Sequence, residues 1–338
     1  MKIGVIGAGS WGTTLANLLA GKGYNVTLWV YEEDLAQRIG KNHINDVYLP
    51  DIDLEPTLKA TSDLAEAAAE KEMLLLVPPS QVMRQVVEQA IPHISFGTLI
   101  VSASKGIEND SLELMSEVLE ETLPKDLRRQ LAYLSGPSFA REVAQGIPTA
   151  VVAAADDTKR AQRVQEIFST PKFRVYSNDD VIGVEVGGAL KNVIALAAGV
   201  ADGLGFGFNS RAALITRGLA EMSRLGVALG ARPETFSGLA GMGDLVLTCT
   251  GDLSRNRSVG IELGKGKRLS DILGGMKMVA EGVKTTLSAY QLAQRLEIEL
   301  PITEQTYRII YEEKEPRQAV SDLMLRDLKS ERDDFANG

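Results

Sequence analysis

The chain begins with a short apolar run that leads directly into a glycine-rich turn. Ile3–Ile6 has the composition of a buried strand, and Gly7-Ala8-Gly9-Ser10-Trp11-Gly12 follows it without a gap. Trp11–Ala20 then has the apolar spacing of a helix. A strand, a GxGxxG turn and a helix in this order are typical of folds that bind a dinucleotide.

Each of the three glycines in this turn occupies a position where a side chain would interfere with the fold or with a ligand. Gly7 allows the tight turn, Gly9 lets the backbone approach a pyrophosphate, and Gly12 lets the helix pack closely on the strand. Amides at the start of the helix would then bind the phosphates. The alternative interpretation is a bare strand-to-helix turn with no ligand.

The first half of the chain continues to alternate short apolar runs with helical spacing. Strands are expected at Val26–Val30, Met73–Val77, Leu99–Ser102, Leu131–Leu134 and Ala150–Ala155, and helices at Gln81–Gln89 and Ser111–Thr122. This alternation predicts an α/β domain of the Rossmann type, with a mainly parallel sheet covered on both faces.

The pattern changes near residue 180, where strand-like alternation largely disappears. Helices are expected at Val184–Ala201, Ser210–Leu229, Ser258–Leu263, Val283–Leu296 and Ile302–Tyr311. We therefore predict a dinucleotide-binding domain over residues 1–180 and an all-α substrate domain over 181–330. The polar residues 331–338 are expected to form a loose tail.

Charge and composition exclude several classes of protein. The 36 basic and 45 acidic residues give a net charge of −9, which disfavours nucleic acid and anionic membrane surfaces as partners. The single cysteine, Cys249, cannot form an intrachain disulfide, and with only two histidines a metal site is not expected. Neither a membrane span nor a signal peptide is predicted, so a cytoplasmic location is expected.

The end of the second predicted strand bears on which cofactor would bind. Glu32 lies 20 residues after Gly12 and could accept a hydrogen bond from a ribose 2′-hydroxyl, which favours NAD. No arginine stands beside it in sequence to hold the 2′-phosphate of NADP. The alternative for Glu32 and Glu33 is a solvated loop followed by the start of a helix.

Two lysines and an aspartate are candidates for proton transfer. Lys191 shares a helix face with small and apolar residues, so its ammonium would lose water and its pKa would fall, unless it reaches out to solvent. The adjacent Gly187-Gly188 pair suggests that something approaches this helix closely. Lys105 follows a predicted strand, and Asp244 either caps a helix or orients a lysine.

Two polar loops could bind an anionic substrate. Ser254-Arg255-Asn256-Arg257-Ser258 places two guanidinium groups among hydroxyl and amide side chains, a combination that suits a phosphate. Ser135-Gly136-Pro137-Ser138-Phe139-Ala140 is a second loop of this kind. The alternatives are a solvated helix start for the first loop and a structural turn for the second.

Taken together, these motifs resemble the bacterial NAD(P)-dependent glycerol-3-phosphate dehydrogenases. The resemblance runs through GAGSWGT, SKGIE, LSGPSFA, EVGGALKNVIALAAGVADGLG, LAGMGDLVLTC, SRNRSVG and VAEGVKT, to about residue 325. It implies reversible reduction of dihydroxyacetone phosphate to glycerol 3-phosphate with NADH or NADPH, in support of phospholipid synthesis. Members of this family commonly form homodimers, so the resemblance also implies a homodimer. Tyr31 stands where many members carry a basic residue, which argues against a strong preference for NADP.

The resemblance also implies roles for individual residues. It implies catalytic roles for Lys191, Lys105 and Asp244. It implies substrate contacts at Lys105, Gly136, Ser138, Lys191, Asn192, Asp244, Thr248, Ser254, Arg255 and Asn256. It implies cofactor contacts at Gly7, Gly9, Ser10, Trp11, Gly12, Tyr31, Lys105, Ala140, Arg255, Val279 and Glu281. Two other hypotheses remain at this stage: a hydroxyacid dehydrogenase of the same architecture, and a cofactor-sensing protein without turnover.

Overall fold

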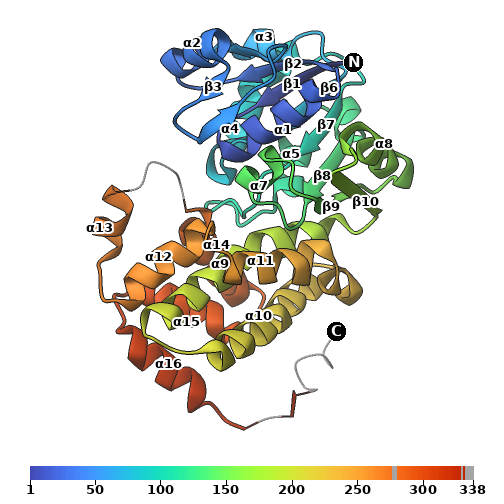
Figure 1. The fold of residues 1–338 in the computed structure, drawn as a ribbon. Helices are drawn as coiled ribbons and strands as arrows, with labels where there is room; N and C mark the ends of the chain where they lie inside the picture. The colour runs from blue at the N-terminus through green and yellow to red at the C-terminus, as the bar shows by residue number, and fades with distance from the viewer. Residues whose placement is uncertain (276–279, 329, 332–338) are drawn as a thin grey trace. The chain divides into compact units, whose positions relative to one another are not determined.

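The computed structural model describes residues 1–275, 280–328 and 330–331, and its contacts divide the chain into two compact units (Figure 1). The first unit consists of Met1–Ser104 and Met115–Val181, and the second of Lys105–Leu114 and the chain from Ile182 onward. We expected residues 105–114 in the first domain. They belong to the second unit because Ile107 and Leu114 lie in its hydrophobic core.

The first unit is built on an eight-stranded sheet in the order β10-β9-β8-β7-β6-β1-β2-β5, which confirms the predicted α/β class. Neighbouring strands pair in parallel, except for the antiparallel pair β8–β9. The strands are β1 (Lys2–Ile6), β2 (Asn25–Trp29), β5 (Lys59–Thr61), β6 (Met73–Leu76), β7 (Leu99–Ser102), β8 (Leu131–Ser135), β9 (Thr149–Ala154) and β10 (Phe173–Asn178).

Helices cover both faces of this sheet, as the apolar strands require. On one face, Val5 and Leu75 join a core with side chains of α1 (Ser10–Gly21), α2 (Glu33–Asn42) and α8 (Thr158–Phe168). On the other face, Leu74 packs with Ala68 of α3 (Leu64–Ala68) and Ala90 of α4 (Met83–Ala90). The remaining helices of this unit are α5 (Met115–Thr122), α6 (Lys125–Arg128) and α7 (Ala140–Ala144).

The strands at the two edges of the sheet were not predicted from the sequence. β5 is short and partly exposed, and β10 alternates buried and exposed residues, so neither forms a continuous apolar run. The separate hairpin of β3 (Ile44–Asn45) and β4 (Leu49–Asp53) was not predicted either. The helix expected from residue 111 begins only at Met115, because Leu112 has a positive φ of 63° and cannot continue a helix.

Every regular element of the second unit's described residues is a helix, apart from the isolated bridge between Ile107 and Leu114. Its helices are α9 (Val181–Gly203), α10 (Phe208–Ala228), α11 (Asp244–Thr250), α12 (Arg255–Gly264), α13 (Leu269–Gly274), α14 (Glu281–Arg295), α15 (Pro301–Tyr311) and α16 (Pro316–Met324). The expected tail, apart from residue 331, lies outside the described residues.

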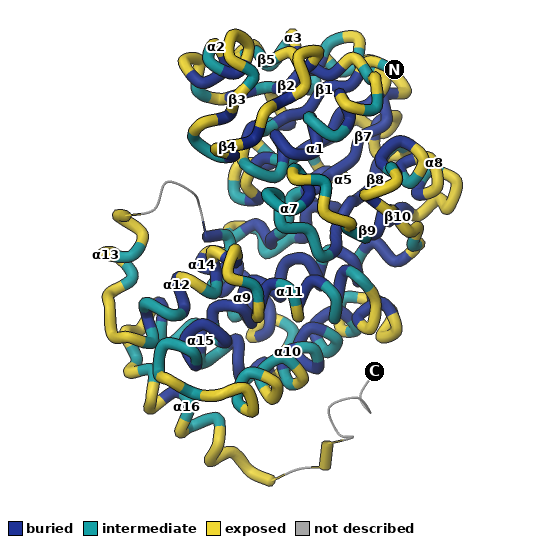
Figure 2. The backbone as a smooth tube through the Cα atoms, in the orientation of Figure 1, coloured by how far each residue is buried: buried dark blue, intermediate teal, exposed yellow. Residues whose placement is uncertain are grey.

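Helix α9 is the centre of the second unit. Figure 2 shows it buried over nearly its whole length, and Leu190, Ile194 and Ala198 are fully buried core residues. α9 is the one helix of the described residues that is long and apolar enough to cross a membrane, a feature that the sequence analysis had not singled out. Its most apolar window is 83% buried, as expected for the core helix of a globular unit.

Candidate functional site

The glycine turn of the first unit adopts the geometry that its sequence predicts. Gly7 has a φ of 113°, and a Cβ there would lie 2.8 Å from the carbonyl of Val77. A Cβ on Gly12 would lie 1.9 Å from the carbonyl oxygen of Gly7, whereas one on Gly9 would meet no described atom within 4 Å. The backbone at Gly9 therefore faces open space at the start of α1, where a pyrophosphate could approach.

A buried asparagine supports this turn from the β3–β4 hairpin. The Asn45 amide donates to the Ala8 carbonyl at 2.9 Å and to the Thr13 hydroxyl at 2.8 Å. The Thr13 hydroxyl donates to the same carbonyl at 3.0 Å. The buried indole nitrogen of Trp11, within the same turn, has no hydrogen-bond partner among the described residues. The hydrogen bonds of Asn45 and Thr13 thus fix the position of the Ala8 carbonyl within the turn.

Glu32 occupies the first cap position of α2, but its carboxylate does not cap the helix. Glu32 Oε1 instead accepts a hydrogen bond from the Tyr48 hydroxyl at 2.6 Å. This bond, together with burial, raises the pKa of Tyr48 to about 12. Tyr31, beside it, is 80% exposed and lies edge-on to Trp29. The carboxylate at the end of β2 is therefore held in one orientation.

The second polar loop of the first unit contains another constrained glycine. Gly136 has a φ of 124°, and its carbonyl accepts from the Ser138 hydroxyl at 3.0 Å. The Ala140 carbonyl, at the start of α7, accepts from the Thr14 hydroxyl of α1 at 3.1 Å. Ala140 is thereby tied to the helix that begins at the glycine turn.

In the second unit, two lysines meet one buried carboxylate. Asp244, the first residue of α11, has a side chain with no solvent exposure. Its Oδ1 pairs with Lys191 Nζ and its Oδ2 with Lys105 Nζ, the latter at 2.7 Å. The Thr248 hydroxyl, one turn further along α11, donates to the Asp244 backbone carbonyl at 2.6 Å. Lys191 is therefore paired inside the protein and does not extend to solvent.

This environment changes the proton affinity of Lys191. Burial lowers its pKa, Asp244 acts in the opposite direction, and the positive charge of Lys105 lowers it again. The result is a pKa of about 7, well below the ordinary lysine value of 10.5. A lysine with this pKa can both donate and accept a proton at neutral pH.

The glycine before Lys191 explains how Asp244 reaches it. A Cβ on Gly187 would lie 2.4 Å from the carbonyl oxygen of Ala240, in the turn Leu239–Gly243 that leads into α11. The close approach that the sequence suggested at this helix is therefore made by protein backbone. It brings the first residue of α11 against α9.

A pair of asparagines lies next to this cluster along the chain. Asn256 Nδ2 donates to Asn192 Oδ1 at 2.9 Å, and Asn256 Oδ1 accepts from the Gly282 amide at 3.0 Å. Both asparagines are buried. This pair connects α9, α12 and the start of α14, where Glu281 lies.

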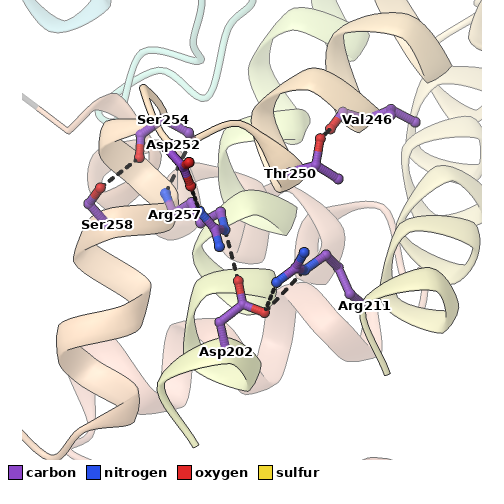
Figure 3. A network of polar contacts seen from close by, with 8 residues as sticks. All are labelled: Asp202, Arg211, Val246, Thr250, Asp252, Ser254, Arg257 and Ser258. Atoms are coloured by element: carbon purple, nitrogen blue, oxygen red, sulfur yellow. Dashed lines mark hydrogen bonds and ion pairs between the residues drawn. The ribbon is translucent and has the colours of Figure 1, made fainter. Parts of the chain in front are cut away.

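The first turn of α12 carries two arginines, Arg255 and Arg257, and Figure 3 shows the contacts of Arg257. The Ser254 hydroxyl caps α12 by accepting from the Arg257 amide at 3.3 Å. The Arg257 side chain pairs with Asp202 at 2.8 Å and with Asp252 at 3.0 Å. Arg255 is an exposed residue, but surrounding protein removes enough water from its guanidinium to lower its pKa, and the negative charge of Glu281 opposes this shift in part.

The structure thus groups the predicted residues within each unit. The glycine turn and Ala140 come together in the first unit, and Lys105, Lys191, Asp244 and Thr248 in the second. Val279 lies outside the described residues. Asn45, Tyr48 and Asp202 were not predicted as functional residues, because each contacts a partner that is distant in sequence. The contact between Tyr48 and Glu32 involves a residue that the sequence had indicated, since Glu32 lies 20 residues after Gly12.

Comparisons with known proteins cover both units. The family profile described as "NAD-dependent glycerol-3-phosphate dehydrogenase N-terminus" matches residues 2–161, and the corresponding C-terminus profile matches residues 180–321. Proteins named glycerol-3-phosphate dehydrogenase [NAD(P)+] are 66% identical in Syntrophotalea carbinolica (98% of this chain, 100% of that protein) and 62% identical in Geobacter sulfurreducens (98% and 99%). The crystal structure of glycerol-3-phosphate dehydrogenase from Coxiella burnetii matches with a TM-score of 0.92 and 42% identity, over 96% of this chain and 99% of that one.

Proposed function

Because this chain belongs to the NAD-dependent glycerol-3-phosphate dehydrogenase family, we propose that it reversibly reduces dihydroxyacetone phosphate to sn-glycerol 3-phosphate with NADH or NADPH. The observation that carries this proposal is the buried cluster of Lys191, Asp244 and Lys105. An ammonium with a pKa of about 7 is suited to exchange a proton with a carbonyl or alcohol oxygen.

The first unit contains the features that fit a dinucleotide cofactor. The glycine turn fits a pyrophosphate because the backbone at Gly9 is open and the helix start offers amide donors. We assign cofactor contacts to Gly7, Gly9, Ser10, Trp11, Gly12, Tyr31, Lys105, Ala140, Arg255 and Glu281. When bound, the reduced nicotinamide supplies a hydride to the carbonyl carbon of the substrate.

Lys191 would donate a proton to the substrate oxygen as negative charge develops there. Lys105 would stabilise that charge with its ammonium. Asp244 would hold both ammonium groups in place, and its carboxylate offsets part of their mutual repulsion. In the reverse direction, neutral Lys191 would accept the proton of the alcohol.

The phosphate of the substrate would lie at the start of α12. Arg255 supplies a guanidinium there, which binds phosphate through two parallel hydrogen bonds. The side chains of Ser254 and Asn256 already make contacts within the protein, so we assign them the additional role of shaping this site. We also assign Gly136, Ser138, Asn192 and Thr248 to the substrate site.

We also propose that the protein is a cytoplasmic homodimer whose product supplies phospholipid synthesis. In addition to the family resemblance, Met324, Leu325 and Leu328 support an association between copies. These three side chains are at least 79% exposed, and a second copy could cover them. Sedimentation velocity at micromolar concentration tests the dimer, and a monomer at every concentration would contradict it.

The activity itself can be tested by following the absorbance of the reduced nicotinamide. NADH or NADPH is incubated with the purified protein and dihydroxyacetone phosphate, with pyruvate as a carboxylate control. We expect oxidation of the cofactor only with the phosphorylated ketone. Oxidation with pyruvate instead would support a hydroxyacid dehydrogenase, and no oxidation with any substrate would support a binding protein.

A further inference from the structure

We propose that Asp202 and Arg257 act together as positioning residues for Arg255, and so determine how tightly the phosphate of the substrate is bound. This inference rests on the proposed function, which places the phosphate at Arg255. Neither Asp202 nor Arg257 needs to touch the substrate. Their role is to hold the first turn of α12 at a defined place on α9.

The first observation is an ion-pair network centred on Asp202 (Figure 3). Its Oδ2 accepts from Arg257 Nε at 2.8 Å, and its Oδ1 accepts from Arg211 Nη2 at 2.6 Å. The side chains of Asp202 and Arg257 are only 9% and 13% exposed. Pairs with so little exposure are weakly screened by water and salt, so they hold their geometry better than surface pairs.

The second observation is that Asn256 and Arg257 contact α9 at three successive positions along that helix. Asn256 bonds Asn192 at 2.9 Å, and the Arg257 carbonyl oxygen lies only 2.1 Å from where a Cβ on Gly199 would be. The Arg257 side chain then reaches Asp202 near the end of α9. These contacts set the register of α12 against the helix that carries Lys191.

The third observation concerns the charge of Arg257. Its guanidinium contacts two carboxylates, Asp202 and the 98% exposed Asp252, so its positive charge is already offset. Arg255, two residues earlier, lies at the first position of α12 and reaches solvent. Arg257 thus anchors α12 to α9, while Arg255 lies exposed at the start of α12. Loss of the anchor would displace Arg255, and phosphate binding depends on such positions to within about 1 Å.

The network itself provides a matched pair of variants. Arg257→Gln and Arg211→Gln each remove one guanidinium from Asp202, but only the first removes a contact between α12 and α9. We expect Arg257→Gln to raise KM for dihydroxyacetone phosphate about tenfold while kcat stays within about twofold of the wild type. Arg211→Gln should leave both constants within about twofold.

A substrate without a phosphate separates positioning from general damage. With dihydroxyacetone, kcat/KM of Arg257→Gln should stay within about twofold of the wild-type value, because Arg255 has no phosphate to bind. Urea unfolding shows whether each variant is folded. If Arg257→Gln does not fold, Arg257→Lys replaces it, because lysine retains the charge but cannot bond both carboxylates as the guanidinium does. Arg257→Lys should raise KM about threefold.

Three results would overturn the inference. They are an unchanged KM in the Arg257 variant tested, an equal rise in Arg211→Gln, and an equal loss of activity on dihydroxyacetone. Failure of the wild-type protein to reduce dihydroxyacetone phosphate would instead refute the proposed function. The two failures are therefore distinguishable.

Discussion

The hydroxyl of Tyr48 donates a 2.6 Å hydrogen bond to the carboxylate of Glu32, at the end of the second strand of the sheet. In folds of this type, an acidic residue at this place accepts from the ribose 2′-hydroxyl of NAD. The one arginine of the adjoining helix α2, Arg38, is paired with Asp34 at 2.5 Å and with Asp46 at 3.2 Å. A 2′-phosphate at this place would therefore meet the carboxylate of Glu32, which would repel it, while the guanidinium of Arg38 is already paired with two carboxylates.

We accordingly expect this protein to bind NADH at least about tenfold more tightly than NADPH. Glu32→Gln should bring the affinities for NADH and NADPH closer together, because it removes the negative charge that repels the 2′-phosphate. Tyr48→Phe should weaken NADH binding a few-fold. Isothermal titration without substrate measures both affinities, and Glu33→Gln is the matched control. Equal affinities for NADH and NADPH in the wild type would contradict the prediction.

The pKa of Lys191 predicts opposite pH dependences for the two directions of the reaction. Its pKa of about 7 lies below the ordinary value, so the ammonium is lost as pH rises through 7. Ketone reduction needs the ammonium and should slow above about pH 7, whereas alcohol oxidation needs the amine and should accelerate. Because Asp244 raises this pKa, Asp244→Asn should move both transitions to lower pH. Profiles of kcat against pH test this.

Removal of the lysine gives a simpler test of its role. We expect Lys191→Ala to lower kcat by about 10²- to 10⁴-fold, the range for loss of a general acid. Steady-state kinetics provide the measurement, and circular dichroism establishes that the variant is folded. A folded variant with nearly normal kcat would remove Lys191 from the mechanism.

Arg255→Ala should act on substrate binding. Hydrogen bonds to a charged group contribute about 1.5–3 kcal/mol, so KM for dihydroxyacetone phosphate should rise about 10- to 100-fold. Arg268→Ala, which removes an exposed arginine near the end of α12, should have no such effect. An unchanged kcat/KM for Arg255→Ala would show that the phosphate is bound elsewhere.

The contact between α9 and α12 predicts an effect on stability. A Cβ on Gly199 would lie 2.1 Å from the Arg257 carbonyl oxygen, so Gly199→Ala should lower the free energy of unfolding by about 2 kcal/mol or more. Gly40 lies in α2, and an added Cβ there meets no described atom within 4 Å. Gly40→Ala should therefore be neutral or stabilise by up to about 1 kcal/mol. Urea unfolding of both variants tests the contrast, and equal stabilities would contradict it.

The glycine turn shows what could be predicted from neighbouring residues. Its strand, turn and helix depend on the apolar run Ile3–Ile6 and on three glycines within six residues. The edge strands could not be predicted in the same way, since β5 and β10 lack a continuous apolar run and gain stability from pairing with β2 and β9.

For the site, the apolar neighbours of Lys191 on its own helix predicted that it faces the protein. They could not identify Asp244 as its partner, because the two residues are brought together by contact between α9 and the turn before α11. The same limitation applies to Tyr48 and Glu32, which meet through a hairpin that the sequence analysis missed.

Apolar periodicity and glycine placement along the chain were therefore sufficient for the α/β class, the glycine turn and the inward face of the central helix. These properties depend on backbone conformation and on burial over a few neighbouring residues. Only the tertiary structure pairs two lysines with one carboxylate. Only the tertiary structure, likewise, shows that Arg257 is paired with carboxylates while Arg255 lies at the exposed start of α12. Each depends on distances between helices that are remote in sequence, and on charges whose strength is set by how much water the packed side chains exclude.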